Sequence, residues 1–127
     1  MPSGDLERLG IDRDLYQARI GRTLEFLEGH YRQPLTVHDV ARSGDWSPRS
    51  MQQAFSLQLG TTPFVLLRRL RLQYAHDRLA NPYCWDSVAT TARSVSIAHL
   101  GRFSAYYSAE YGELPSETRA RSQRVTT

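Results

Sequence analysis

The sequence makes the same turn twice, and this repeat constrains the fold more than any other feature. The stretch LGTTPFVL begins at Leu59 and the stretch YGELPSET begins at Tyr111. In both, an apolar or aromatic residue precedes a glycine, and a proline follows three positions after that glycine. Glycine commonly ends a helix in the left-handed conformation, and proline is favoured at the first position of a helix. Each stretch therefore predicts that one helix ends and the next begins.

The residues ahead of the two turns extend the repeat. Val40-Ala41 and Trp46 match Thr91-Ala92 and Ile97 at an offset of 51 positions. Closer to the glycines the offset is 52, and it pairs Met51 with Phe103, Phe55 with Tyr107, Leu59 with Tyr111, Gly60 with Gly112 and Pro63 with Pro115. Each half is therefore a short helix, a tight turn and a longer helix, followed by the glycine stop and the proline start.

Apolar residues recur at helical spacing along the chain, and alternating runs of β-branched residues are absent. This pattern predicts an all-α fold of seven helices. The predicted helices cover residues 14–31, 37–43, 48–59, 63–79, 86–95, 98–111 and 115–121. Two helix-turn-helix units, at about 36–60 and 86–112, are joined by the long helix 63–79 within one domain at 14–122. A flexible segment is expected at 1–13 and a frayed tail at 123–127.

The length and the absence of certain segments narrow the class of protein. A chain of 127 residues suits one domain or two very small units. No apolar run approaches ~18 residues, and the N-terminus has no apolar signal-peptide core. Cys84 is the only cysteine, so neither an internal disulfide nor a cysteine metal cluster is possible. We therefore expect a cytoplasmic chain without a membrane partner.

The basic residues of the chain are all arginine. There are 16 of them against 13 acidic residues, which gives a net charge of +3 and a pI of about 9.3. Two interpretations are open. The arginines reflect a compositional bias of the source genome, or they bind phosphate, for which the planar guanidinium is well suited. Composition alone does not choose between them, and a field of this size steers a partner only weakly.

A short helix packed across a longer one through a tight turn is the helix-turn-helix, whose second helix reads DNA in the major groove. The candidate recognition helices are 48–59 and 98–111. In the first, Met51, Phe55 and Leu59 recur every four residues and should face inward. The residues left facing outward are Arg49, Ser50, Gln52, Gln53 and Ser56. Because arginine and glutamine make two-pronged contacts with guanine and adenine edges, this face can read sequence.

At these residues the chain resembles the DNA-binding domain of the AraC/XylS family of bacterial transcription regulators. The resemblance covers about Ala18 to Ser122, and it is closest to the XylS-like branch, whose pattern also reads HLGRF and FGELPS in the second unit. It implies sequence-specific binding to double-stranded operator DNA, with the two recognition helices in successive major-groove segments about 34 Å apart. RNA polymerase is a further implied partner, and any effector domain would lie outside this chain.

The resemblance also implies which residues meet DNA. Base contacts fall on Arg49, Gln52, Gln53, Leu100, Gly101 and Arg102. Contacts with the DNA backbone, or support for the base-contacting side chains (the readers), fall on Ser47, Ser50, Ser56, His99 and Ser104. Gln53 and Ala105 stand where many members have arginine, and Asp45 and Ser96 stand where glycine is usual in the turns. Because the second helix has few polar readers, we expect the first helix to set most of the sequence preference.

Two other classes of protein are weighed against this interpretation. A helical module that contacts RNA polymerase or a partner domain, with only weak non-specific DNA binding, would lose little affinity with added salt, whereas DNA binding would weaken steeply. An enzyme is not expected, because no Ser/His/Asp arrangement and no glycine-rich phosphate loop stand out. The four histidines share no metal-ligand spacing, so neither a metal nor another cofactor is expected. Trp46 and Trp85 are expected in the core.

Overall fold

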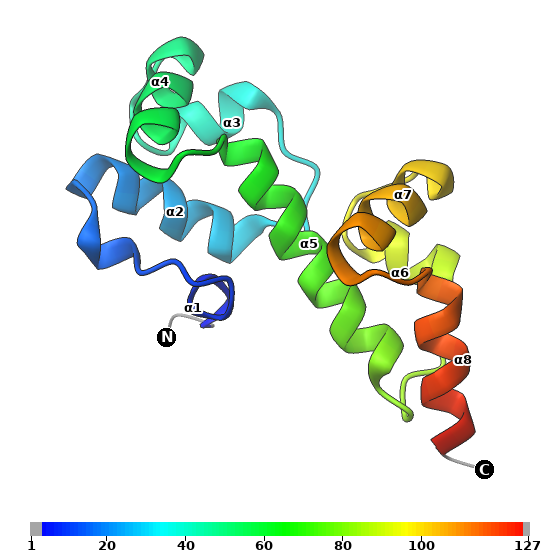
Figure 1. Cartoon of the computed structure of the whole chain (residues 1–127). Coiled ribbons are helices and arrows are strands. Elements are labelled where there is room, and N and C mark those ends of the chain that lie inside the picture. The colour runs from blue at the N-terminus through cyan, green and yellow to red at the C-terminus, as the bar shows by residue number, and fades with distance from the viewer. Residues whose placement is uncertain (1–3, 126–127) are drawn as a thin grey trace. The chain divides into compact units, whose positions relative to one another are not determined.

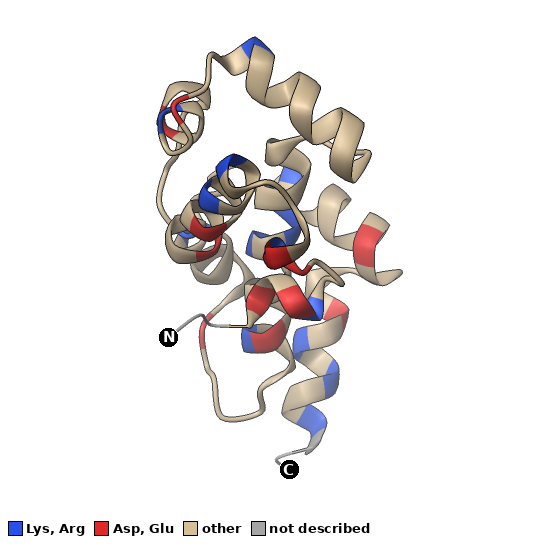
Figure 2. Ribbon diagram, turned by 90° about the vertical axis from the view of Figure 1, so that its left-hand side faces the viewer, with Lys and Arg blue, Asp and Glu red and all other residues tan. Residues whose placement is uncertain are grey.

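The computed structural model describes residues 4–125, and these residues form helices and connecting turns without a β-strand (Figure 1). The helices are α1 (Asp5–Arg8), the 3-10 helix η1 (Arg13–Leu15), α2 (Ala18–His30), α3 (Val37–Arg42), α4 (Pro48–Leu59), α5 (Pro63–Ala80), α6 (Val88–Ser94), α7 (Leu100–Tyr111) and α8 (Pro115–Val125). The predicted all-α class is confirmed. The chain divides into two compact units, Met1–Leu70 and Arg71–Thr127, so each helix-turn-helix belongs to a unit of its own. Figure 2 shows acidic and basic residues interspersed along the helices.

The described residues contain eight α-helices where seven were predicted, and the additional helix is α1. Leu6 in α1 is buried, and its backbone N–H donates a hydrogen bond of 2.8 Å to Oε2 of Glu28 on α2. The other carboxylate oxygen of Glu28 accepts from the guanidinium of Arg13 at 3.5 Å, and Tyr31 donates to Asp5 at 3.1 Å. A helix of four residues is not stable by itself, and contacts with α2 stabilise this one. Sequence periodicity therefore could not predict it.

Several helix boundaries also differ from the prediction. Residues 14–31 were predicted as one helix, but η1 and α2 are separate because Tyr16 is extended, with a ψ of 166°. Both α6 and α7 begin two residues later than predicted because Ser87 and His99 are their N-caps. The last helix, α8, continues to Val125 and is four residues longer than predicted.

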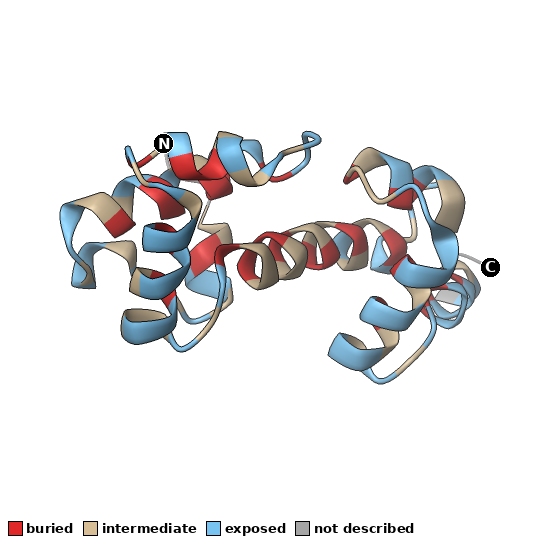
Figure 3. Cartoon of the chain, turned by 90° about the horizontal axis from the view of Figure 1, so that it is seen from above, coloured by how far each residue is buried: buried red, intermediate tan, exposed pale blue. Residues whose placement is uncertain are grey.

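In the first unit, α2 packs against α1, η1 and α3, and α3 packs against α4. The buried side chains of these helices include Leu6, Ile20, Leu24, Leu27, Val40, Met51 and Phe55. Figure 3 shows the same division on the ribbon, with exposed residues along the outer side of α4. The short helix α3 begins with a capping box, in which hydrogen bonds with Thr36 lower the pKa of Asp39.

The turn between α3 and α4 is anchored by Trp46. Its backbone N–H donates to the carbonyl of Ala41 at 2.9 Å, and its indole N–H donates to Oγ1 of Thr23 at 3.0 Å. The guanidinium of Arg19 lies 4.1 Å from the centre of the indole ring and donates to the carbonyl of Gly44 at 2.7 Å. Trp46 therefore packs, partly buried, at the corner of the first motif.

In the second unit, one buried cluster joins α5, α6 and α7: Leu72, Ala75, Leu79, Ala92, Val95, Phe103 and Tyr107. The hydroxyl of Tyr107 donates to Thr118 on α8 at 2.8 Å and lies 2.8 Å from Nδ1 of His76. Thr118 donates in turn to Glu113, which accepts two hydrogen bonds from Arg121, at 2.6 and 2.9 Å. Burial raises the pKa of Tyr107, so its hydroxyl remains a donor in this chain of hydrogen bonds.

The expectation that Trp85 lies in the core is wrong. Its side chain is 75% exposed, and the nearby Tyr83 is exposed as well. The loop that carries both is held by Arg119, a buried residue of α8 whose guanidinium donates to the carbonyls of Cys84 at 2.6 Å and Asp86 at 2.8 Å. Because these hydrogen bonds order the loop through its backbone, the indole is not required to fix it.

Candidate nucleic-acid interface

The ends and the inner face of α4 determine which of its side chains are presented outward. Ser47 is the N-cap; it accepts from the backbone N–H of Ser50 at 3.1 Å and donates to the hydroxyl of the same residue at 2.9 Å. A proline follows at the first helical position, and Gly60 ends the helix with a φ of 69°. Met51 and Phe55 are fully buried. The burial of these two side chains therefore determines which residues of α4 face outward.

The outward face of α4 brings its three predicted base-contacting residues together. Arg49, Gln52 and Gln53 are exposed and line one hollow of about 650 Å³. The other residues that line this hollow, which we name the reader hollow, are Ser56, Leu57 and Thr62. The predicted supporting residues Ser47, Ser50 and Ser56 are also exposed. The hollow therefore combines hydrogen-bonding side chains of the kind that suit purine edges with one apolar side chain.

Leu57 was not predicted as a site residue. It is 87% exposed, and it follows Gln53 by four positions and Arg49 by eight. That four-residue spacing is the same signal that identified the inward face, so it could have placed Leu57 on the outward ridge.

The second candidate recognition helix, α7, begins at a histidine cap. Nδ1 of His99 accepts from the backbone N–H of Arg102 at 3.2 Å, so the neutral ring carries its hydrogen on Nε2. Phe103 and Tyr107 are fully buried and fix the inner face. Of the predicted site residues on this motif, His99, Leu100, Gly101 and Arg102 are exposed and Ser104 is partly exposed. His99 thus supports the start of the helix and also offers a donor that suits a phosphate oxygen.

The two motifs correspond closely on each side of their turns. Asp45 and Ser96 both have positive φ angles, 54° and 62°, in the region that favours glycine. The offset between these two residues is 51, whereas the offset between the caps Ser47 and His99 is 52. Ala98 therefore lies in the part of the second turn that is one residue longer than the first.

The outward ridges of the two recognition helices differ in length of side chain. The outermost positions of α4 are Arg49, Gln53 and Leu57, and the matching positions of α7 are Gly101, Ala105 and Ala109. At Gly101 a Cβ would lie 3.1 Å from Cε1 of His99, so even a small side chain is crowded there. α4 therefore presents long side chains, and α7 presents a shallow surface with Arg102 beside it.

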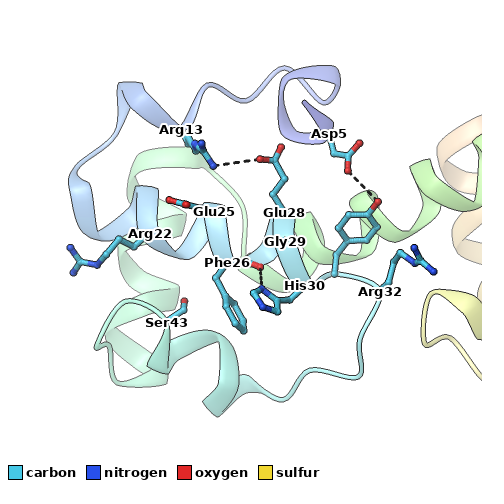
Figure 4. A pocket seen from close by; sticks show the side chains of 11 residues that line it. Asp5, Arg13, Arg22, Glu25, Phe26, Glu28, Gly29, His30, Arg32 and Ser43 are labelled. Carbon is cyan, nitrogen blue, oxygen red and sulfur yellow. Dashed lines mark hydrogen bonds and ion pairs between the residues drawn. The ribbon is translucent and has the colours of Figure 1, made fainter. Parts of the chain in front are cut away.

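A second hollow in the first unit has a structural explanation. It measures about 870 Å³ and lies beside α2 (Figure 4). Among the residues that line it, Arg13 pairs with Glu28, and Asp5 accepts from the hydroxyl of Tyr31. These pairs hold the N-terminal segment on α2.

Within residues 4–125, no group of three or more histidine, cysteine or acidic residues could hold a metal ion. Within the same part of the chain, no helix is long and apolar enough to cross a membrane.

Comparison with known proteins places these motifs in a family. A family model described as "Helix-turn-helix domain" matches residues 40–121. The chain is 40% identical over 95 residues to the "Probable thc operon regulatory protein" of Rhodococcus erythropolis. The match covers 74% of this chain and 29% of that protein. It is also 33% identical over 98 residues to the "XylDLEGF operon transcriptional activator 2" of Pseudomonas putida. This match covers 76% of this chain and 62% of that protein. The chain thus spans less than two thirds of the length of either relative.

A solved structure supports the same assignment. The crystal structure of a probable AraC family transcriptional regulator from Rhodopseudomonas palustris CGA009 matches with a TM-score of 0.78 and 30% identity, over 82% of this chain and 96% of that one. The family model covers more than half of the chain and includes both recognition helices. The chain therefore belongs to the AraC/XylS family, as a helix-turn-helix DNA-binding domain of transcription regulators.

Proposed function

We propose that the chain binds double-stranded operator DNA in a sequence-specific manner, with α4 and α7 in successive major-groove segments. The observation that supports this most directly is the reader hollow, where Arg49, Gln52 and Gln53 are exposed together. The arginine suits a two-pronged contact with guanine, and each glutamine suits the same kind of contact with adenine. Contacts of α4 with phosphates are assigned to Ser47, Ser50 and Ser56.

The contribution of α7 is different in kind. Arg102 is the only basic residue of this helix, and it suits a phosphate or a guanine. Leu100 and Gly101 offer apolar and small surfaces to the bases, while His99 and Ser104 suit phosphate oxygens. We therefore assign most of the sequence preference to α4, and anchoring with limited base readout to α7.

Selection of binding sites from random duplex DNA tests this proposal. A defined site should emerge, and the affinity for it should fall steeply with salt because phosphate contacts release counterions. Arg49→Ala should weaken binding by about 1–3 kcal/mol and relax one base position. Arg22→Ala removes an exposed arginine of α2 outside both recognition helices, so it should leave the selected site unchanged. A site that is identical for wild type and Arg49→Ala would contradict the assignment.

The alternative, a helical protein-interaction module with only weak non-specific DNA binding, has no support in the comparisons. The chain is not an enzyme, since its family and its relatives are transcription regulators.

We propose RNA polymerase as a further partner because one relative is named a transcriptional activator. The relatives are longer than this chain, and we assign effector binding to a region outside it. The proposed location is the cytoplasm, where operator DNA is found in bacteria.

A further inference from the structure

The outward ridge of α4 continues past the hydrogen-bonding readers to an apolar residue. Leu57 stands on the same ridge as Arg49 and Gln53, at intervals of four residues, and its side chain is 87% exposed. Isolated exposed leucines are ordinary on protein surfaces and by themselves carry no functional meaning. Leu57, however, lines the reader hollow together with Arg49 and both glutamines.

The chemistry of the major groove offers one apolar group to such a residue. Adenine, guanine and cytosine present hydrogen-bond donors and acceptors there, whereas thymine also presents its C5-methyl group. A leucine beside hydrogen-bonding readers therefore complements a thymine. The matching residue of α7 is Ala109, whose single methyl group reaches much less far from the helix axis.

We propose that Leu57 is a specificity-determining residue that contacts a thymine methyl group in the operator segment bound by α4. This inference rests on the proposed function. Its position on the helix also predicts where the thymine lies. Leu57 follows Arg49 by eight residues, a rise of about 12 Å along the helix. Since base pairs are stacked about 3.4 Å apart and a recognition helix is inclined to the DNA axis, the thymine lies at most three to four base pairs from the base that Arg49 contacts.

Deoxyuridine provides the test because it differs from thymidine only by the missing methyl group. Each thymine in the α4 segment of the selected site is replaced in turn, and binding of the full chain is measured by fluorescence anisotropy. Wild type should lose affinity about fourfold at one position, which is the effect of removing one buried methyl group. Leu57→Ala should bind the thymine site more weakly than wild type does. It should show no further loss when that thymine becomes deoxyuridine.

Leu15→Ala is the matched control. Leu15 belongs to η1, outside the recognition helices, and it is 77% exposed. Its substitution removes the same apolar surface and should leave the deoxyuridine effect at the wild-type value. Leu57→Ala should fold normally because alanine is a strong helix former and the leucine is exposed. Circular dichroism of both variants checks this.

The outcomes separate the inference from the proposed function. A defined site at which wild type and Leu57→Ala lose affinity equally at every deoxyuridine would overturn the role of Leu57 and leave the proposed function intact. The same holds if Leu57→Ala binds as tightly as wild type. A selection that yields no defined site for wild type would overturn the proposed function, and the inference with it.

Discussion

The corner of the first motif allows one substitution to be tested at two glycines with opposite expected results. Gly44 lies in the turn before Trp46, and a Cβ there would lie 2.3 Å from the indole Nε1 and 2.6 Å from Oγ1 of Thr23. The backbone of Gly44 is outside the left-handed region, so the effect of Gly44→Ala comes from lack of space alone. At Gly29 in α2, a Cβ would have no neighbour within 4 Å. Gly29→Ala is therefore the matched control.

The size of the effect follows from what the indole of Trp46 must give up to make room. Moving it breaks the hydrogen bond to Thr23, worth about 1 kcal/mol, and the contact with the guanidinium of Arg19, worth about 0.5–1 kcal/mol. Some burial is lost as well, so Gly44→Ala should lower the free energy of unfolding of the first unit by about 2–3 kcal/mol. Gly29→Ala should raise it by at most about 0.5–1 kcal/mol, because alanine is more stable than glycine in a helix and Gly29 is the next-to-last residue of α2.

Urea unfolding followed by tryptophan fluorescence measures both changes. Trp85 lies in the second unit and is largely exposed, so Trp85→Phe is introduced into the parent and both variants. The remaining signal then reports on Trp46. If Gly44→Ala were as stable as the parent, the indole would not be packed against the turn, and the reasoning would be refuted. A comparable loss for Gly29→Ala would show that lack of space is not the reason.

Two further predictions concern the second unit. Arg119→Ala should destabilise this unit by about 2–3 kcal/mol and speed amide exchange in the loop around Trp85, because the loop carbonyls lose a charged donor; unchanged exchange would contradict this. Hydrogen bonds from Arg121 and then Thr118 lower the pKa of Glu113 from 4.5 to about 2. The stability that Glu113 contributes is therefore complete above about pH 4.5 and is lost as the pH falls towards 2. Glu113→Gln should remove this part of the acid dependence in denaturation measured across that range; an unaltered profile would argue against it.

The boundaries that were predicted well are those set by local signals. α4 begins and ends where expected, because Ser47, Pro48 and Gly60 act on their own neighbours. The N-terminal segment was predicted poorly because its helix depends on a contact between residues 22 positions apart, Leu6 and Glu28. A carboxylate that accepts from a distant backbone N–H leaves no local pattern, so sequence periodicity could not reveal it.

Residue type misled the prediction at two exposed positions, Trp85 and Leu57. Trp85 was assigned to the core because tryptophan usually packs there, yet a buried arginine, Arg119, orders its loop instead. Leu57 was not predicted as a site residue because side chains that contact base edges are usually polar. The exposure of Trp85 depends on a residue 34 positions away in the sequence, whereas that of Leu57 follows from the helical spacing of α4.

The comparison of α4 with α7 shows what the internal repeat does and does not transmit. Both motifs share the left-handed residue in the turn, the capped start and the glycine stop, and these features build the scaffold. The outward ridges share nothing: arginine, glutamine and leucine on one face correspond to glycine and two alanines on the other. Repetition of the sequence pattern therefore predicts the fold of both halves but the reading surface of neither. Because base readout depends on the outward side chains, the two operator segments should carry unequal sequence information, with the more selective segment under α4.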